Sequence, residues 1–190
     1  MAEAVVFTSG NGSNFQAICE AVAETEHKIT AMICNKKDAY SFVRAAKLGI
    51  PAYHVSYLGR SRGETEAEID ALLTRLKPDL IVLAGFMKLL SPEMTEKYAG
   101  KIINIHPALL PKYPGTHGIE ESFASPDKEL GVTVHYVDAG MDTGKVIRQK
   151  SFFRTGEETI EEIEEKIHAC EYEIYPQTVI ELLNRAEEGK

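Results

Sequence analysis

The sequence predicts an α/β protein with a Rossmann-like, doubly wound and mostly parallel sheet, helices on both faces, and a C-terminal strand pair plus helix. Three observations predict this class. Short apolar runs alternate with amphipathic segments through the first half of the chain. One run, Leu80–Ala84, is apolar at every position, which is typical of a central strand buried on both faces. After Pro107 the alternation ends, and two strand-like segments precede a long amphipathic stretch.

In the first half, strands and helices alternate, which predicts parallel strands joined by crossover helices. Gly49 closes the second helix, while Ser91 and Pro92 open the fourth as N-cap and first helical residue. The third helix carries an apolar stripe that predicts its buried face. The expected strands are Ala4–Thr8, Ile29–Cys34, Ala52–Val55, Leu80–Ala84 and Lys101–Ile105; the expected helices are Phe15–Ala23, Tyr40–Leu48, Glu64–Leu76 and Pro92–Tyr98; the stripe is Ile69, Leu72, Leu73 and Leu76.

The segment after the fifth strand is organised differently. Pro107–Gly118 is a loop rich in proline and glycine, and loops of this length in compact domains are often functional. Val132–Val137 and Val146–Phe153 alternate like strands. The turn-rich connector Asp138–Gly144 joins them, so we expect a strand pair here.

The C-terminal segment predicts helix. Glu157–Glu173 is amphipathic, and Pro176 either kinks this helix or separates it from a last one at Thr178–Glu187. The chain shows neither internal repeats nor an interdomain linker. We therefore expect one domain over residues 1–190.

Composition limits the classes of partner. The formal net charge of -8 argues against nucleic acid as the main partner, although a local basic pocket for one phosphate remains open. Cys19, Cys34 and Cys170 lack paired spacing, which favours reduced thiols in the core of a cytoplasmic protein. The sequence shows no signal peptide and no membrane span, so we expect no membrane partner.

The stretch Ile102–Pro111 carries the strongest functional signal. Period-2 alternation places Asn104 and His106 on the same face of a strand, at the edge where open parallel sheets bind ligands. An amide can donate to an oxyanion, and an imidazole can donate or shuttle a proton near neutral pH. The pair is a candidate site for acyl transfer. The alternative is a buried histidine bonded to backbone and an asparagine that ends the strand.

The turn Gly10–Asn14 lies between the first strand and the first helix, where backbone amides can approach an anion. A dinucleotide fingerprint would continue to a third glycine, but Phe15 occupies that place. It would also need an acidic residue where Asn35-Lys36-Lys37 stands. The pattern favours a cradle for one phosphate; the alternative is a tight turn with a helix cap.

Four further features carry weaker signals. Asp142 could reach His106 if its connector folds over the sheet edge, or it could bond its own turn. Gly85–Leu90 could wall a flat organic ligand, or be ordinary core. Arg62 could contact a ligand's polar end and Glu171 an amine or hydroxyl, or both could be solvated surface residues. The remaining histidines show no metal-ligand spacing.

Taken together, these segments resemble the folate-dependent formyltransferases, and the resemblance covers essentially the whole chain. It is strongest to the branch that acts on glycinamide ribonucleotide, because the turn at Gly10–Asn14 is more specific than the other motifs. Lys88, Lys145 and Thr116 depart from residues common in relatives, where Arg, Pro and Leu are usual. The matching segments are Ser9–Asn14, Ala84–Met87, Asn104–Pro107, Leu109–Pro111, Gly131–Val137, Met141–Gly144, and Glu171 with Ile174–Pro176.

The resemblance implies transfer of the formyl group from 10-formyltetrahydrofolate to the amine of glycinamide ribonucleotide in purine synthesis, without a metal. It implies that Asn104 stabilises the tetrahedral oxyanion. His106, kept protonated by Asp142, would stabilise that charge and donate a proton, while Asp142 could relay protons through water. The implied ribonucleotide ligands are Gly12, Ser13, Asn14, Phe15, Gln16 and Glu171; the implied folate ligands are Arg62, Met87, Lys88, Leu89, Leu90 and Asn104.

Three alternatives stay open at this point, as does the choice between monomer and homodimer. A formyltetrahydrofolate deformylase would use His106 and Asp142 to activate water, and usually carries a further N-terminal domain. A methionyl-tRNA formyltransferase would need a second, basic domain for RNA, which neither 190 residues nor a net charge of -8 favours. A non-enzymatic nucleotide sensor would need the phosphate turn but not Asn104, His106 and Asp142.

Overall fold

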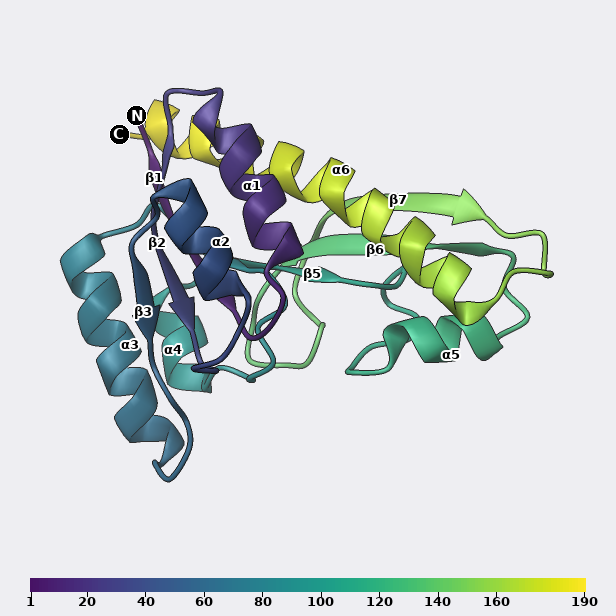
Figure 1. Ribbon diagram of the computed structural model, residues 1–190, viewed down its shortest axis with the longest axis horizontal. Helices are drawn as coiled ribbons and strands as arrows, with labels where there is room; N and C mark the ends of the chain where they lie inside the picture. The colour runs from purple at the N-terminus through teal and green to yellow at the C-terminus, as the bar shows by residue number, and fades with distance from the viewer.

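The computed structural model describes all residues 1–190 and contains one sheet of seven strands in the order β3-β2-β1-β4-β5-β6-β7 (Figure 1). Strands β1 to β5 are parallel, β6 runs antiparallel to β5, and β7 runs antiparallel to β6. The predicted fold class is confirmed, and β4 takes the middle position expected of a strand buried on both faces. The strands are β1 Glu3–Thr8, β2 Lys28–Cys34, β3 Ala52–His54, β4 Leu80–Leu83, β5 Ile102–His106, β6 Glu129–Tyr136 and β7 Val146–Phe153.

Helices cover both faces of the parallel part of the sheet (Figure 1). Alternation along β1 decides the side: Ala4 and Val6 pack toward α1, α2 and α6, whereas Val5 and Phe7 pack toward α3 and α4. Each large apolar side chain buried in this way stabilises the fold by about 1.5–3 kcal/mol. The helices are α1 Ser13–Ala23, α2 Ser41–Leu48, α3 Arg62–Leu76, α4 Pro92–Lys97, α5 Gly118–Ala124 and α6 Ile160–Glu188.

The predicted helix ends agree with the structure where a local signal exists. Gly49 ends α2 with a left-handed φ of 69°. The Ser91 hydroxyl accepts from the Met94 amide at 3.2 Å, and Pro92 is the first residue of α4. Short helix α5 begins where the predicted loop ends, in a segment for which the sequence predicted no element, because it has no side-chain cap and too few residues to show a periodic pattern.

Of the two alternatives at Pro176, a separate last helix at Thr178–Glu187 was wrong. Helix α6 runs without interruption past Pro176, and it begins at Ile160 because Thr159 and Glu162 form a capping box there. Its central turns are held by tertiary packing: Tyr175 is fully buried, and its hydroxyl donates to the Leu83 carbonyl of β4 at 2.7 Å. This packing outweighs the hydrogen bond that a proline cannot make.

The three cysteines behave as core residues. Cys19, Cys34 and Cys170 are buried and unpaired, as predicted. Burial raises the pKa of the Cys19 thiol to about 12, and it also raises that of Cys170. None of the helices combines the length and the apolar character that crossing a membrane requires.

Candidate functional site

A cleft opens at the carboxyl ends of β1, β4 and β5, the edge at which the sequence predicted a site. It consists of two hollows of about 280 Å³ and 430 Å³. Asn104, His106 and Asp142 line the smaller hollow, and the turn after β1 lines the larger one. The hollows are adjacent and share five wall residues, namely Gly85, Met87, Ile105, Pro107 and Thr116.

Strand β5 delivers Asn104 and His106 to the same hollow, as the alternation predicted. The His106 side chain is only 3% exposed. Its Nε2 lies 2.6 Å from the Tyr113 carbonyl oxygen, and its Nδ1 lies 3.4 Å from Oδ2 of Asp142. Both partners can only accept hydrogen bonds, so an imidazolium with two N–H groups satisfies this geometry. The shorter contact commits the Nε2 proton to the backbone, and the longer one leaves the Nδ1 proton available.

Asp142 connects two loops at this end of the cleft. Its Oδ2 accepts from the Gly115 amide at 2.8 Å, and its Oδ1 lies 3.5 Å from Nε2 of His135. The residue has a left-handed φ of 56°, an unusual conformation for a non-glycine residue. Burial tends to raise the pKa of this carboxyl, but the contacts with His135, the Gly115 amide and His106 outweigh it and hold the pKa below its usual range. The predicted approach of Asp142 to His106 is confirmed.

The structure adds His135, which sequence reasoning did not place in the site. In the register of β5 and β6, His135 is opposite Asn104. Its Nδ1 lies 2.8 Å from the Tyr136 carbonyl oxygen, and its Nε2 lies 3.3 Å from Nδ2 of Asn104 and 3.5 Å from Oδ1 of Asp142. The contact with Asn104 orients the amide and leaves its second N–H free for a ligand.

Thr133 stabilises the loop that follows His106. It is opposite His106 in the β5–β6 register. Its hydroxyl donates to the Ala108 carbonyl at 2.7 Å and accepts from the Leu110 amide at 3.0 Å. The hydroxyl is fully buried with these partners, so the start of the loop is fixed by β6 and not only by its own prolines.

The larger hollow is bounded by the turn before α1. Gly12 precedes the helix with a φ of 76°, and a side chain there would put Cβ 2.6 Å from Cβ of Ser41. The Ser41 amide donates to the Gly10 carbonyl at 3.1 Å. Because the first-turn amides of a helix have no intrahelical partner and carry its positive dipole end, this turn can bind an anion.

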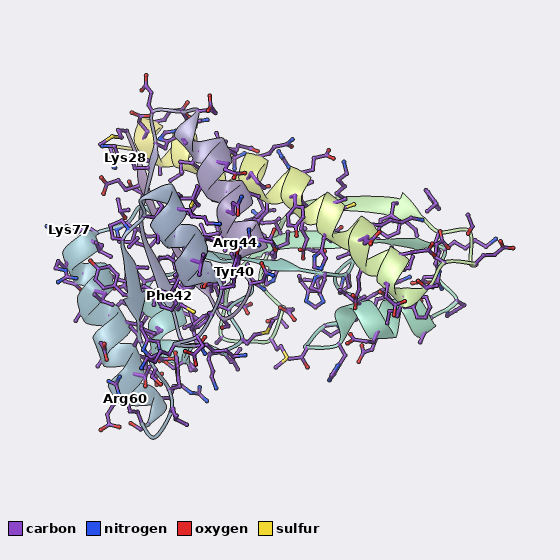
Figure 2. The ribbon with its side chains drawn as sticks, in the orientation of Figure 1. Lys28, Tyr40, Phe42, Arg44, Arg60 and Lys77 are labelled. Carbon is purple, nitrogen blue, oxygen red and sulfur yellow. The ribbon has the colours of Figure 1, made fainter.

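Helix α2 holds the same turn in place. Arg44 donates from Nε to the Asn11 carbonyl at 2.9 Å. Its guanidinium lies 5.0 Å from the centre of the Tyr40 ring; Arg44 lies within α2 and Tyr40 immediately before it (Figure 2). The turn is thus fixed from outside before any ligand binds.

Glu171 reaches this hollow from α6, far away in sequence. Its Oε2 accepts from Nδ2 of Asn14 at 2.9 Å and lies 3.0 Å from Nδ1 of His168. The hydrogen bond with Glu171 raises the pKa of His168. Oδ1 of Asn14 is buried without a partner. Glu171 and His168 thus place a carboxylate and a titratable imidazole beside the N-terminus of α1.

The other residues predicted to bind the substrates lie in different parts of the structure. The Phe15 side chain is fully buried in the core, so only its backbone can serve the cradle. Gln16 bonds Glu20 and Arg44 and does not line either hollow. Arg62 lines a separate hollow between α3 and α4.

The segment Met87–Leu90 lines the Asn104 hollow. Met87 and Leu89 are exposed, whereas Leu90 is buried in the core. Sequence reasoning also missed Thr116 and His168, since their approach depends on long-range packing that no local motif indicates.

Comparisons with known proteins agree with this geometry. The formyl transferase family model matches residues 2–179. The chain is similar to phosphoribosylglycinamide formyltransferase of Bacillus subtilis, with 38% identity over 100% of this chain and 99% of the relative. It is 41% identical to the Haemophilus influenzae protein of that name, over 93% of this chain and 84% of the relative. The solved structure of glycinamide ribonucleotide transformylase 1 from Geobacillus kaustophilus has a TM-score of 0.91 at 41% identity, and the match covers 96% of this chain and 99% of that one.

Proposed function

The chain belongs to the formyl transferase family, and from this premise we propose that it transfers the formyl group of 10-formyltetrahydrofolate to the amine of phosphoribosylglycinamide in de novo purine biosynthesis. The products are formylglycinamide ribonucleotide and tetrahydrofolate. Similarity to phosphoribosylglycinamide formyltransferases over the full length supports this activity. The observation that carries it is the meeting of Asn104, His106 and Asp142 in a hollow next to a helix terminus that can bind an anion.

The two halves of the cleft suit the two substrates. We assign the ribonucleotide phosphate to the α1 terminus, with Gly12, Ser13 and Asn14, and the ribose side to Glu171. The folate occupies the Asn104 hollow, where Met87–Leu90 offers apolar surface for a flat ring. Arg62 lies in its own hollow, where it could meet only an extended polar part of the folate.

In the first step, the amine lone pair attacks the formyl carbon and the carbonyl becomes an oxyanion. The free N–H of Asn104, oriented by His135, donates to that oxygen. The positive charge of the His106 imidazolium stabilises the same oxyanion. These donors are fixed before the substrates arrive, which is the arrangement that lowers a barrier most.

In the second step, the bond between the formyl carbon and N10 of the folate breaks, and N10 takes the available Nδ1 proton of His106. The amine, now bonded to the formyl group, loses its extra proton to Asp142, directly or through water. Asp142 then returns this proton to Nδ1 of His106. The net result is one formyl group moved to the amine and one proton moved from the amine to N10.

Further aspects of the proposal concern the context in which the enzyme acts. Three buried, unpaired cysteines support a reducing compartment, and we assign the protein to the cytoplasm. We treat residues 1–190 as one formyltransferase domain that works as a monomer or homodimer on two small molecules.

The test is the release of tetrahydrofolate from 10-formyltetrahydrofolate, measured with and without phosphoribosylglycinamide. Release that requires the ribonucleotide supports the proposal. Release without it would make water the acceptor and favour a deformylase. No release under either condition would contradict formyl transfer to this acceptor.

A further inference from the structure

Tyr113 connects the imidazole of His106 to a carboxylate outside the cleft. Its carbonyl oxygen receives the Nε2 proton of His106 at 2.6 Å, and its hydroxyl donates to Oδ2 of Asp127 at 2.7 Å. Asp127 precedes β6 and lines neither hollow of the cleft. One residue therefore joins His106 to an anion that cannot touch the substrates assigned above.

The backbone of Tyr113 needs such an anchor. Its φ of 54° lies in the left-handed region, which residues with a side chain adopt rarely. Conformations of this kind persist only where the surroundings hold them. The loop around Tyr113 has few backbone hydrogen bonds of its own; one joins the Lys112 amide to the Leu109 carbonyl. The bond from the Tyr113 hydroxyl to Asp127 is thus a restraint on the residue that presents this carbonyl, from the side away from His106.

We propose that Asp127 is a positioning residue for the formyl-transfer step: by holding the Tyr113 hydroxyl, it fixes the carbonyl that orients His106. The proposal rests on the proposed function, because it matters for catalysis only if His106 acts there. A carbonyl held on Nε2 keeps the ring turned so that Nδ1 faces Asp142 and the cleft. If the carbonyl swings away, the imidazole loses its shorter bond and its fixed orientation.

Asp127 is suited to this role by its own contacts. Its backbone N–H donates to Oγ of Ser125 at 3.2 Å, and Lys112 donates to its Oδ2 at 2.6 Å. Hydrogen bonds from Lys112 and Tyr113 lower the pKa of this carboxyl, so it remains an anionic acceptor. The titratable groups that face His106 itself are Asp142 and, across that carboxylate, His135. Asp127 acts on His106 only through Tyr113.

The experiment compares Asp127→Ala, Tyr113→Phe and the double variant in steady-state formyl transfer. We expect each single variant to lower kcat by about tenfold to a hundredfold, because a small misplacement of a reacting group has effects of this size. The KM values of both substrates should stay within about twofold, since neither side chain lines the cleft. The double variant should lose no more than the worse single variant, because both remove one hydrogen bond.

Two controls separate positioning from general damage. Asp127→Asn keeps an acceptor oxygen for Tyr113 and should recover most of kcat. Lys112→Met removes the other bond to Asp127 but leaves Tyr113 in place, so kcat should stay within about twofold. Circular dichroism and unfolding in urea identify variants that fail to fold; if Asp127→Ala is one of them, Tyr113→Phe decides the question.

A readout independent of activity is the NMR signal of the His106 Nε2 proton, which a bond to a carbonyl shifts downfield and protects from exchange with water. This signal should be lost or broadened in Asp127→Ala and Tyr113→Phe and retained in Lys112→Met. An unchanged signal with full kcat in both variants would overturn the proposal, as would losses that multiply in the double variant. Full activity of His106→Ala would instead contradict the proposed mechanism, while the NMR signal would still report whether Asp127 positions the ring.

Discussion

The two ends of the cleft are built in different ways. At the cradle, the contiguous turn Gly10–Asn14 presents backbone groups, with Glu171 as the distant addition. The other end, which we call the transfer end, holds Asn104, His106 and Asp142. There Asn104 of β5 contacts His135 of β6, and Asp142 of the β6–β7 connector contacts the loop after β5. Each functional side chain there is oriented by a group from another segment.

The difference shows what each end tolerates. A cradle built largely from backbone depends first on the shape of the chain, and Asn14, His168 and Glu171 add side-chain contacts to it. A transfer end built around side chains depends on their identity. The comparison therefore predicts that damage to the cradle appears in binding and stability, and damage to the transfer end in the chemical step.

The largest expected effect is at Asn104. Asn104→Ala removes the proposed oxyanion donor, and we expect kcat to fall by roughly a hundredfold to a thousandfold with little change in the KM of the ribonucleotide. The matched cradle variant is Asn14→Ala, which loses the bond to Glu171. In Asn14→Ala the KM for the ribonucleotide should rise by about tenfold, while kcat changes little. Steady-state kinetics with both substrates varied measures the split, and the same pattern in both variants would break the comparison.

The next effect is on stability, at Gly12. Gly12→Ala places a Cβ 2.6 Å from Cβ of Ser41 at a left-handed φ of 76°. Strain and overpacking together should lower the free energy of unfolding by roughly 2–4 kcal/mol. Gly10→Ala in the same turn is the control, because a Cβ there meets no atom within 4 Å. Urea unfolding of both variants measures the difference; equal losses would show that the turn is not held by close packing against α2.

The comparison also explains how far the sequence could predict the site. The pattern of strands and helices in the parallel half, and the placement of Asn104 and His106 on one face, follow from local periodicity and were confirmed. The cradle turn was visible for the same reason, since its glycine and helix start are adjacent in sequence. Local signals therefore sufficed for the cradle and for the first two residues of the transfer end.

The rest depends on pairings that no local signal contains. His135 enters the site only because β6 pairs antiparallel with β5 in a register that places it opposite Asn104. The partner of His106 Nε2 is the backbone carbonyl of Tyr113, which any residue type could supply, so the sequence could not predict this contact. Continuous packing of α6 across Pro176 is likewise decided by contacts with β4 and not by helix propensity. The transfer end is thus the part that required the structure.

The dependence of stability on acid pH tests the transfer end at Asp142. Its pKa is lowered in the folded protein, so its contribution to stability is fully present above the ordinary aspartate pKa of about 3.9 and is lost as the pH falls through the lower folded value. The difference in unfolding free energy between the parent protein and Asp142→Asn should therefore be constant near neutral pH and shrink below about pH 4. Urea unfolding between about pH 3 and 7, with about one measurement per pH unit, follows this difference in unfolding free energy.

The control for Asp142 lies in the same connector. Asp138 accepts from the Gly140 amide and the Thr143 hydroxyl, and Asp138→Asn keeps an acceptor oxygen for both. This variant removes a carboxylate of the same connector that contacts neither histidine, so it controls for the loss of a charge in this connector. A flat difference for Asp142→Asn would show that its carboxylate is not stabilised by the two histidines and the Gly115 amide.

The smallest expected effect tests His168, the histidine that lines the cradle hollow. Glu171 raises the pKa of His168, so the imidazolium beside the cradle is fully formed below the ordinary histidine value of about 6.5 and is lost as the pH rises through the higher folded pKa. The KM for the ribonucleotide should rise by a few-fold over that range, and by less than about tenfold because the side chain is half exposed and solvent screens its charge. His168→Ala should bind more weakly at low pH and lose this dependence. Titration of the substrate itself is common to both proteins and cancels in their ratio. In Glu171→Gln the rise in KM should move to lower pH; if it stays where it is in the parent, the cradle's pH dependence does not come from the pair of His168 and Glu171.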